Sequence, residues 1–354
     1  MGRCALAVGC TAFSACSFPR PPDLTDDAGV TNDAPPGDAP LVDAASPVDA
    51  APPSSCVGLS KTCGPTRDDD CCRSLEVPGG TFHRSYDLAA DSASGGTNFP
   101  ATVSTFRLDK YEVTIGRFRT FLEAGMGTQA HPPAPGAGAH PNLAASGWDA
   151  SWTANLKADT AALAASLKCD PLYPLWSDAP GTGSSSNEDR PMSCITWYDA
   201  MAFCIWDGGY LPTEAEWNYA AAGGDQQRAY PWSSPAGSLT PIGTLYASYN
   251  DGTNCVGDDL PGCALTDLVV VGTKPAGNGR WGHADLGGNV WEWTLDSAAN
   301  YPNPCVDCTV QAGGDHIIRG SAFVDREGGM RTGFRFNNAT LTRSAAVGVR
   351  CARP

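Results

Sequence analysis

Apolar and polar residues recur along this chain in patterns that predict short helices joined by irregular segments. Residues 115–122 carry apolar side chains at three- and four-residue spacing, with Thr114 placed to cap the helix and Gly125 placed to end it. The same helical pattern occurs at 197–206 and 214–221. In both cases a threonine precedes the first turn, and an acidic residue lies three positions after that threonine. The pattern thus predicts three well-capped helices.

The strand-like segments are short and lie in the first third of the chain. Residues 75–82 predict a strand, a tight turn and a second strand, and residues 101–109 alternate like a half-buried strand. Residues 126–147 are rich in Gly, Pro, Ala and His, which predicts an excursion over the surface. Its two histidines, His131 and His140, are therefore expected to be loop residues.

Composition adds a core and many turns to this pattern. Of the 354 residues 42% are hydrophobic and 10 are tryptophan, which suffices for a buried core. The 40 glycines and 29 prolines, against 17% charged residues, favour turns and loops. The net charge of −15 excludes nucleic acid as a partner, because phosphates require a basic face, and also excludes electrostatic docking on anionic lipid. Cations remain compatible ligands.

The cysteines and the first residues indicate export. The 15 cysteines are more than a reduced cytosolic protein keeps, so an oxidising compartment is expected. Residues 1–16 contain an apolar stretch and the sequence Phe-Ser-Ala-Cys, which resembles the lipobox of bacterial lipoproteins and makes Cys16 the lipidated residue. Cys10 is a second candidate, and an ordinary signal peptide is the alternative. We therefore predict an exported lipoprotein of the bacterial cell envelope that touches the membrane through its lipid anchor only.

Two segments separate this signal from the folded part. Residues 17–55 consist mostly of Pro, Ala, Asp, Val and Ser and predict a disordered tether. Residues 56–74 contain four cysteines among Gly, Pro and Asp, which predicts a collar closed by disulfides. A zinc knuckle is the alternative, but the adjacent Cys71 and Cys72 cannot easily supply two ligands of one tetrahedral site. The globular domain is predicted to cover residues 75–354.

One loop combines residues that are hard to accommodate outside a rigid site. The sequence Gly-Gly-Asn-Val-Trp-Glu-Trp-Thr at 287–294, introduced by Asp285, unites two glycines, two tryptophans and two carboxylates. The glycines permit unusual backbone conformations, the indoles must be buried, and the acids must then be solvated, paired or bound to a metal. The loop is predicted to be a rigid, irregular part of the core.

Six motifs follow one another in a characteristic order. They are Thr-Trp-Tyr-Asp-Ala at 196–200, Leu-Pro-Thr-Glu-Ala-Glu-Trp at 211–217, Tyr-Pro-Trp at 230–232, Gly-Asn-Val-Trp-Glu-Trp-Thr at 288–294, Arg-Gly-Ser-Ala-Phe at 319–323 and Val-Gly-Val-Arg-Cys-Ala at 347–352. Together they resemble the formylglycine-generating enzyme family, also called sulfatase-modifying factors. The resemblance implies one α+β domain of the C-type-lectin-like kind, with two main helices, small antiparallel sheets and much irregular structure.

The resemblance bears directly on catalysis. Active members of that family hold copper(I) with two thiols five positions apart and use oxygen to convert a sulfatase cysteine to formylglycine. Counted from Arg319, the two thiol positions fall on Asp325 and Met330, and no cysteine occurs between Cys308 and Cys351. Aspartate is a hard oxygen ligand, and a single thioether binds Cu(I) more weakly than thiolates do. The chain is therefore predicted to lack copper and copper-dependent formylglycine formation, and no catalytic residue is assigned.

The resemblance also implies a disulfide between Cys204 and Cys351. The family's second bridge would require cysteines near Ala221 and Arg335, and both are absent. Two local pairs and one pair left by elimination account for the other cysteines of the domain: Cys255 with Cys263, Cys305 with Cys308, and Cys169 with Cys194. For the Cys-x-x-Cys pair a redox role is the alternative to the structural role that its context favours.

The family further binds calcium through the loop at 285–292. Carried over, the ligands are the side chain of Asp285, the main-chain carbonyls of Gly288 and Val290, and the side chain of Glu292. Hard oxygen donors at this spacing can converge when glycines let the backbone curl, and two carboxylates neutralise the ion. The alternative is that Glu292 forms a cap or a salt bridge within the loop without metal.

Two functions are compatible with these observations. The first is a calcium-stabilised, non-catalytic binding module on a tether at the cell envelope, which presents its groove to a peptide, protein or glycan. The second is an oxidoreductase of the family, with formylglycine-generating or altered oxidative chemistry. For altered chemistry His283, His316 and Asp325 would form a metal site, although a structural role of the histidines is favoured. The missing thiols favour the binding module.

Overall fold

The predicted helices begin at their predicted caps. The computed structural model describes residues 53–89, 96–181 and 186–354. Helix α1 spans Ile115–Glu123, and the Thr114 hydroxyl accepts a hydrogen bond from an amide of its first turn. Helices α3 (Trp197–Trp206) and α4 (Glu214–Ala222) each begin with a complete capping box, formed by the predicted threonine and acidic residue. Gly223, with a φ angle of 65°, ends α4 in the left-handed conformation that favours glycine.

The sequence pattern does not predict helix α2 (Thr160–Ser166). The Asp159 side chain caps this helix by accepting a hydrogen bond from the Ala162 amide. Its interior is mostly alanine, and only Leu163 is buried, so no apolar stripe marks it in the sequence. The described residues thus form four α-helices, not only the two main ones that the resemblance implies.

Nine short strands form three small sheets. In chain order they are β1 (Ser74–Val77), β2 (Gly80–His83), β3 (Pro100–Val103), β4 (Phe106–Asp109), β5 (Trp291–Ser297), β6 (His316–Arg319), β7 (Phe336–Asn338), β8 (Val347–Gly348) and β9 (Ala352–Arg353) within the described residues. The sheet orders are β1-β4-β9, β2-β3 and β7-β6-β5-β8. The strand pairs are antiparallel, as the predicted small antiparallel sheets require, and the short pairing of β5 with β8 is parallel.

The predicted turn between the first two strands does not reverse the chain. β1 pairs with β4 and β2 pairs with β3, so both strands continue along one antiparallel ribbon formed with residues 100–109. At the break between them the Gly79 amide donates a hydrogen bond to the Thr105 hydroxyl at 3.0 Å. The strand predicted at 101–109 is divided at the same place. Pro78 and Gly79 therefore mark a bend, and long-range pairing decides against a hairpin.

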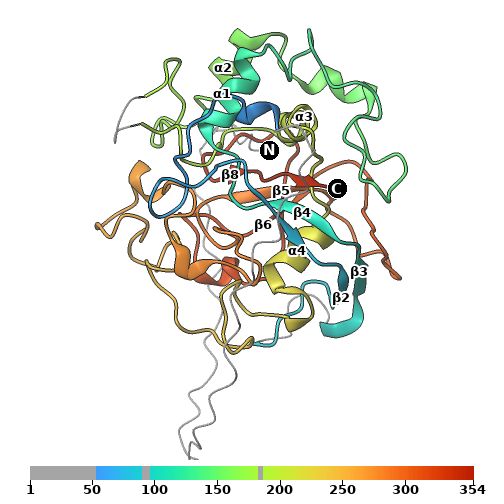
Figure 1. Ribbon diagram of the computed structural model, residues 1–354, viewed down its shortest axis with the longest axis vertical. Coiled ribbons are helices and arrows are strands. Elements are labelled where there is room, and N and C mark those ends of the chain that lie inside the picture. The colour runs from blue at the N-terminus through green and yellow to red at the C-terminus, as the bar shows by residue number, and fades with distance from the viewer. Residues whose placement is uncertain (1–52, 90–95, 182–185) are drawn as a thin grey trace, which may run out of the picture. The chain divides into compact units, whose positions relative to one another are not determined.

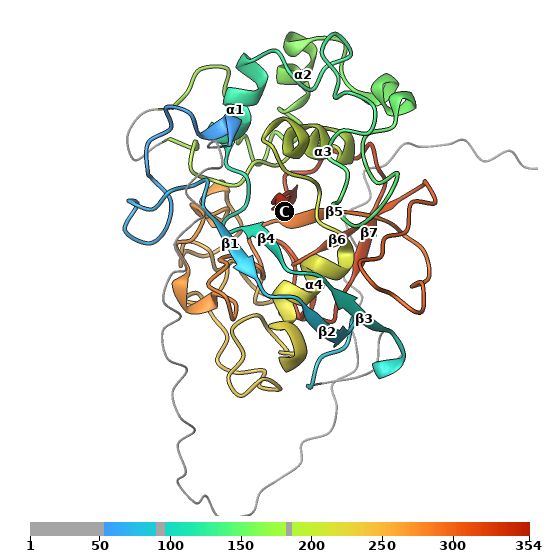
Figure 2. The same ribbon diagram turned by 45° about the vertical axis from the view of Figure 1, so that its right-hand side comes forward.

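Strand β5 lies between helices on both sides. Figures 1 and 2 show α1, α2 and α3 on one side of β5 and α4 on the other. The Trp197 indole of α3 donates to the Thr294 carbonyl at 2.8 Å, and the Trp217 indole of α4 donates to Glu292 at 2.7 Å. Both acceptors belong to β5, whose residues are all buried. The segment that follows the glycine-rich loop is therefore the centre of the core.

The excursion predicted at 126–147 lies partly inside the molecule. His131 is exposed, as expected, but His140 is buried, and its Nε2 lies 3.1 Å from the Glu216 carboxylate. The Tyr210 hydroxyl donates to the same oxygen at 2.8 Å. The prediction of a surface loop residue is wrong for His140, because the segment folds back onto the first turn of α4.

The collar is closed and anchored to the domain. Its four cysteines form two disulfides, Cys56–Cys72 and Cys63–Cys71, as the disulfide interpretation predicts. Just before it, the Ser55 amide donates to Asp207 at 2.8 Å. The described residues all belong to one compact unit. The predicted signal with Cys16, and all but the end of the tether, lie outside the described residues. Among the helices that the structure describes, none has the length and apolar composition needed to cross a bilayer.

Candidate functional site

The loop at 285–294 curls tightly before and into β5. Asn289 has a φ angle of 63°, and Gly288, at 86°, lies so close to the main chain that a Cβ atom would collide with the Ser248 carbonyl oxygen. Only glycine fits this position. The Asn289 side chain closes the curl by donating a hydrogen bond to Glu112 at 2.7 Å. The loop is thus a rigid, irregular element with a buried carboxylate against it.

The carboxylate of Glu292 is held by an arginine of the last motif. Arg350 donates from Nε to Oε2 at 2.6 Å and from Nη2 to Oε1 at 2.7 Å, and the Trp217 indole donates to Oε2 at 2.7 Å. Both charged side chains are completely buried. Other N–H groups of Arg350 donate to three main-chain carbonyls. A bidentate, charge-assisted pair therefore joins β5 to the C-terminal segment.

Two further carboxylates lie near this pair and have raised pKa values. Burial raises the pKa of Glu112 well above its ordinary value, and the negative charges of Asp285 and Glu292 raise it further. Burial likewise raises the pKa of Asp285 to about 6, against the hydrogen bond that this carboxylate accepts from the Gly272 amide. Burial and the mutual repulsion of these carboxylates therefore both disfavour negative charge at this site.

Of the predicted calcium ligands Asp285, Gly288, Val290 and Glu292, the Glu292 carboxylate already has a charged partner. Both oxygens of Glu292 are engaged by Arg350, whose guanidinium would repel a divalent cation placed beside it. Within the described part of the chain no group of three or more His, Cys, Asp or Glu side chains could hold a metal ion. The salt bridge of the alternative interpretation is therefore present. Calcium at this loop stays a prediction.

The two positions of the family's thiol pair hold side chains with structural contacts. Asp325 precedes a short 3-10 helix at Glu327–Met330, and its Oδ2 accepts a hydrogen bond from the Trp291 indole at 2.7 Å. Burial raises the pKa of this carboxyl, while the Trp291 hydrogen bond opposes the rise. Met330 is buried in an aromatic cluster that contains Trp232. Neither position offers a thiolate.

Every cysteine among the described residues is in a disulfide. Besides the two collar bonds, the pairs are Cys169–Cys194, Cys204–Cys351, Cys255–Cys263 and Cys305–Cys308, which confirms all four pairs predicted for the domain. This part of the chain consequently has no free thiol for copper(I), which binds most tightly to soft sulfur ligands.

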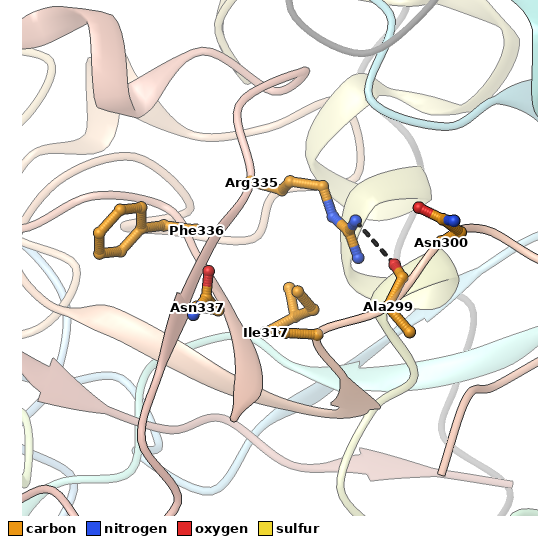
Figure 3. A pocket seen from close by; sticks show the side chains of 7 residues that line it. Ala299, Asn300, Ile317, Arg335, Phe336 and Asn337 are labelled. Carbon is orange, nitrogen blue, oxygen red and sulfur yellow. Dashed lines mark hydrogen bonds between the residues drawn. The ribbon is translucent and has the colours of Figure 1, made fainter. Parts of the chain in front are cut away.

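An open hollow of about 480 Å³ lies against strands β6 and β7 (Figure 3). Its lining residues come from the segment after β5, from β6, and from β7 with the residue before it: Ala298, Ala299, Asn300, Ile317, Arg335, Phe336 and Asn337. Figure 3 shows the Arg335 guanidinium turned toward the Ala299 carbonyl, to which Nη1 donates at 3.1 Å. The Phe336 side chain is 46% exposed, and its ring centre lies 6.0 Å from that of Trp291. Phe336 thus packs against Trp291, whose indole donates a hydrogen bond to Asp325. The hollow therefore lies beside one of the two positions where the family has its thiols.

Arg335 belongs to a buried ion network at the start of α4. Glu214 binds Arg335 at 2.7 Å through Oε2 and Arg319 at 2.6 Å through Oε1. Burial alone would raise the pKa of Glu214, but the two guanidinium groups hold it below its ordinary value. The ion network of Glu214 thus fixes one wall of the hollow.

The histidines of the alternative metal site are not assembled with Asp325. Burial lowers the pKa of His283 to about 3, and the charge of Arg350 lowers it further. His316 is stacked on Trp197, with ring centres 4.1 Å apart, and burial lowers its pKa to about 4. Within the described part of the chain, these histidines and Asp325 belong to no group of three or more side chains that could hold a metal ion.

Sequence reasoning missed two residues of this site. Arg350 stands in one of the six motifs, next to a bridged cysteine, and its presence in a buried motif was the available signal that it needs an acidic partner. Glu112 gave no comparable signal, because it lies between a strand and a helix far from the loop in sequence.

Comparison with known proteins assigns the domain. Residues 60–354 match the family model of the sulfatase-modifying factor enzyme 1-like domain. The chain belongs to the sulfatase-modifying factor family. A formylglycine-generating enzyme of Thermomonospora curvata is 28% identical to this family member over 301 residues, which cover 78% of this chain and 92% of the relative.

Two further comparisons extend this assignment. A Mus musculus protein named inactive C-alpha-formylglycine-generating enzyme 2 is 30% identical over 293 residues, which cover 78% of this chain and 84% of that protein. The structure of PvdO from Pseudomonas aeruginosa superposes with a TM-score of 0.50 at 18% identity, covering 86% of this chain and 99% of that one. This likeness shows the fold alone. The sulfatase-modifying factor domain thus has the C-type-lectin-like α+β fold of its family.

Proposed function

We propose that this sulfatase-modifying factor family member is an exported binding module of the cell envelope without copper-dependent formylglycine formation. The observation that carries the proposal is the chemistry at Asp325 and Met330, where the family's thiol pair is expected. A carboxylate bound by an indole and a buried thioether replace the thiols. Because every cysteine of the described residues is in a disulfide, this part of the chain offers no second thiol pair.

The hollow beside Trp291 supports a binding role. Its volume of about 480 Å³ lies within the usual range of ligand pockets. Phe336 and Ile317 offer apolar surface, while Asn300 and Asn337 offer amide donors and acceptors. This mixture suits a segment of peptide, protein or glycan, the partner classes that we propose. The mouse relative that is named an inactive enzyme supports a role without catalysis.

Export and anchoring are further parts of the proposal. Six disulfides in the described residues support an oxidising compartment outside the cytosol. Lipidation at Cys16 would hold the domain at the envelope by its tether.

An oxygen electrode and mass spectrometry test the loss of catalysis. The purified protein is incubated with Cu(I), oxygen and a Cys-x-Pro-x-Arg peptide, and we expect neither oxygen consumption nor the peptide aldehyde. The control is Asp325→Cys combined with Met330→Cys, which should retain more copper than the unaltered protein. Oxygen consumption or aldehyde formation by the unaltered protein would instead establish the alternative, an oxidoreductase of the family.

Peptide and glycan arrays test the binding role. Ligands that bind the unaltered protein should be lost with Phe336→Ser, because this change removes the exposed ring from the hollow. Leu172→Ser is the matched control, since Leu172 is also an exposed apolar residue but does not line the hollow. Equal losses in the two variants, or none in either, would contradict a binding site at this place.

A further inference from the structure

A buried arginine without an acidic partner lies against the Cys305–Cys308 disulfide. Arg84 follows β2 directly and is 2% exposed. Its Nη1 donates to the Cys308 sulfur at 3.4 Å, and its other donors reach two main-chain carbonyls. The guanidinium carbon lies 4.4 Å from the centre of the Tyr301 ring. No carboxylate of the described residues forms an ion pair with Arg84.

A buried guanidinium in these surroundings is incompletely neutralised. Carbonyl dipoles and an aromatic face offset part of the cost of burying a charge, but a full counter-ion offsets more. Burial lowers the pKa of Arg84, and Arg335 adds to this shift, while Tyr301, Glu214 and Asp296 oppose it without forming an ion pair with Arg84. A negative charge on the adjacent Cys308 sulfur would supply the missing partner. Opening the disulfide creates that charge, because a reduced cysteine beside a cation is a thiolate.

Access to the disulfide is one-sided. Cys305 is buried, whereas Cys308 is partly exposed, and Val306 between them is 68% exposed. The short loop is fixed to β3, since the Thr102 amide donates to the Cys305 carbonyl at 3.0 Å and the Asp307 amide donates to the Thr102 carbonyl at 2.9 Å. An incoming thiolate can therefore reach the Cys308 sulfur in a loop that keeps its shape.

We propose that Cys305–Cys308 is a thiol–disulfide exchange site for thiol pairs of peptides, in which Cys308 exchanges and Arg84 is the positioning residue for its thiolate. This activity goes beyond the binding role proposed above and does not depend on it. A substrate thiolate attacks the Cys308 sulfur, the bond to Cys305 breaks, and Cys305 leaves as a thiolate that takes a proton from solvent.

The second step returns a disulfide to the substrate. Another substrate thiolate attacks the substrate sulfur of the mixed disulfide, a substrate disulfide forms, and Cys308 leaves as the thiolate paired with Arg84. Two electrons pass from two substrate thiols to the protein disulfide. Of the two protons that these thiols lose, one ends on Cys305 and one in solvent. A low-molecular-weight disulfide such as oxidised glutathione reverses the exchange and restores the oxidised protein.

The Cys255–Cys263 disulfide is an internal comparison. Cys263 is exposed, more so than Cys308, but its sulfur accepts a hydrogen bond from the neutral Asn250 amide, at 3.7 Å, and not from a cation. If exposure governed reduction, Cys255–Cys263 would open first. If the Arg84 guanidinium governs the order of reduction, Cys305–Cys308 opens first.

A glutathione titration of the full-length protein separates these outcomes. After equilibration at rising ratios of reduced to oxidised glutathione, the thiols are alkylated and each disulfide is quantified by mass spectrometry. We expect Cys305–Cys308 to open at a ratio about tenfold or more below that for Cys255–Cys263, as one unit of thiolate stabilisation implies. The reverse order would overturn the proposal.

The pH dependence of alkylation tests the role of Arg84. In partly reduced protein, Cys308 should reach half-maximal alkylation clearly below about pH 8.5, the value of a free cysteine. Arg84→Gln should move this midpoint up by about one unit or more, and Arg84→Lys should largely restore it. A midpoint of Cys308 at or above that of free cysteine in the unaltered protein refutes the proposal even if the variants do not fold, and an unchanged midpoint in Arg84→Gln refutes the role of the arginine.

Discussion

Replacing Arg350 tests whether the loop at 285–294 is held by an ion pair or by a metal. Arg350→Met keeps an unbranched side chain but removes the guanidinium from Glu292. Breaking a buried pair by removing one partner costs about 3–5 kcal/mol, because the other charge stays buried without a counter-ion. The Trp217 indole still donates to Glu292, which keeps the loss within this range. Against a typical total stability of about 5–15 kcal/mol, the variant should be only marginally folded.

Urea unfolding with intact disulfides measures this loss. Glu292→Gln, alone and with Arg350→Met, completes a double-mutant cycle, and we expect the double variant to be more stable than the sum of the two single losses predicts. Lys168→Met is the control, since the Lys168–Asp178 pair is exposed, with side-chain exposures of 47% and 68%, and its loss should not be measurable.

Calcium gives the result that would refute the ion-pair assignment. Each unfolding curve is recorded in calcium and in a chelator, and the structure predicts no difference, because Arg350 occupies both oxygens of Glu292. If calcium raised the free energy of unfolding and made Arg350→Met as stable as the unaltered protein, Glu292 would be a metal ligand. The calcium site predicted from the family resemblance would then be correct.

Three other predictions concern stability. Burial alone would lower the pKa of His140, but the hydrogen bond to Glu216 raises it above its ordinary value. The stabilising contribution of His140 is therefore fully present below about pH 6.5 and is lost as the pH rises through the higher pKa of the folded state. Thermal unfolding of His140→Gln should lack this pH dependence, and identical pH profiles of the two proteins would contradict the prediction. Glu214→Gln should lower the free energy of unfolding by about 3–5 kcal/mol, because two arginines lose their partner; a loss under about 1 kcal/mol would disprove this. Cys204→Ala with Cys351→Ala opens a loop with a sequence separation of 147 and should cost about 5 kcal/mol in the chain-entropy model; an unchanged melting temperature would refute that estimate.

The parts of the fold that depend on neighbouring residues could be predicted from the sequence. The helix starts at Thr114, Thr196 and Thr213 are set by hydrogen bonds within three residues, and the structure has each of them. The substitution of the thiol pair was also readable, because it needs only the motif spacing. Helix α2 was not, since a cap at Asp159 and an alanine interior leave no periodic signal.

The parts that depend on distant residues could not be predicted in the same way. The pairing of β1 and β2 is decided by residues 100–109, and His140 is buried because Glu216, 76 positions later, accepts its hydrogen bond. The partner of Glu292 lies 58 positions away. In each case the composition of the segment suggested a local interpretation, and contacts with residues far away in the sequence decided the structure.

The Cys56–Cys72 disulfide determines how a mechanical load reaches the domain. Its Cα atoms lie 6.0 Å apart at a sequence separation of 16, a length of chain that spans about 55 Å when fully extended. A pull on the N-terminal side enters at Cys56, crosses the sulfur bridge and arrives at Cys72, two residues before β1. The intervening residues carry no tension and cannot lengthen while the bridge is intact. The collar therefore cannot lengthen under load, and the force is transmitted directly to β1, the first strand of its sheet.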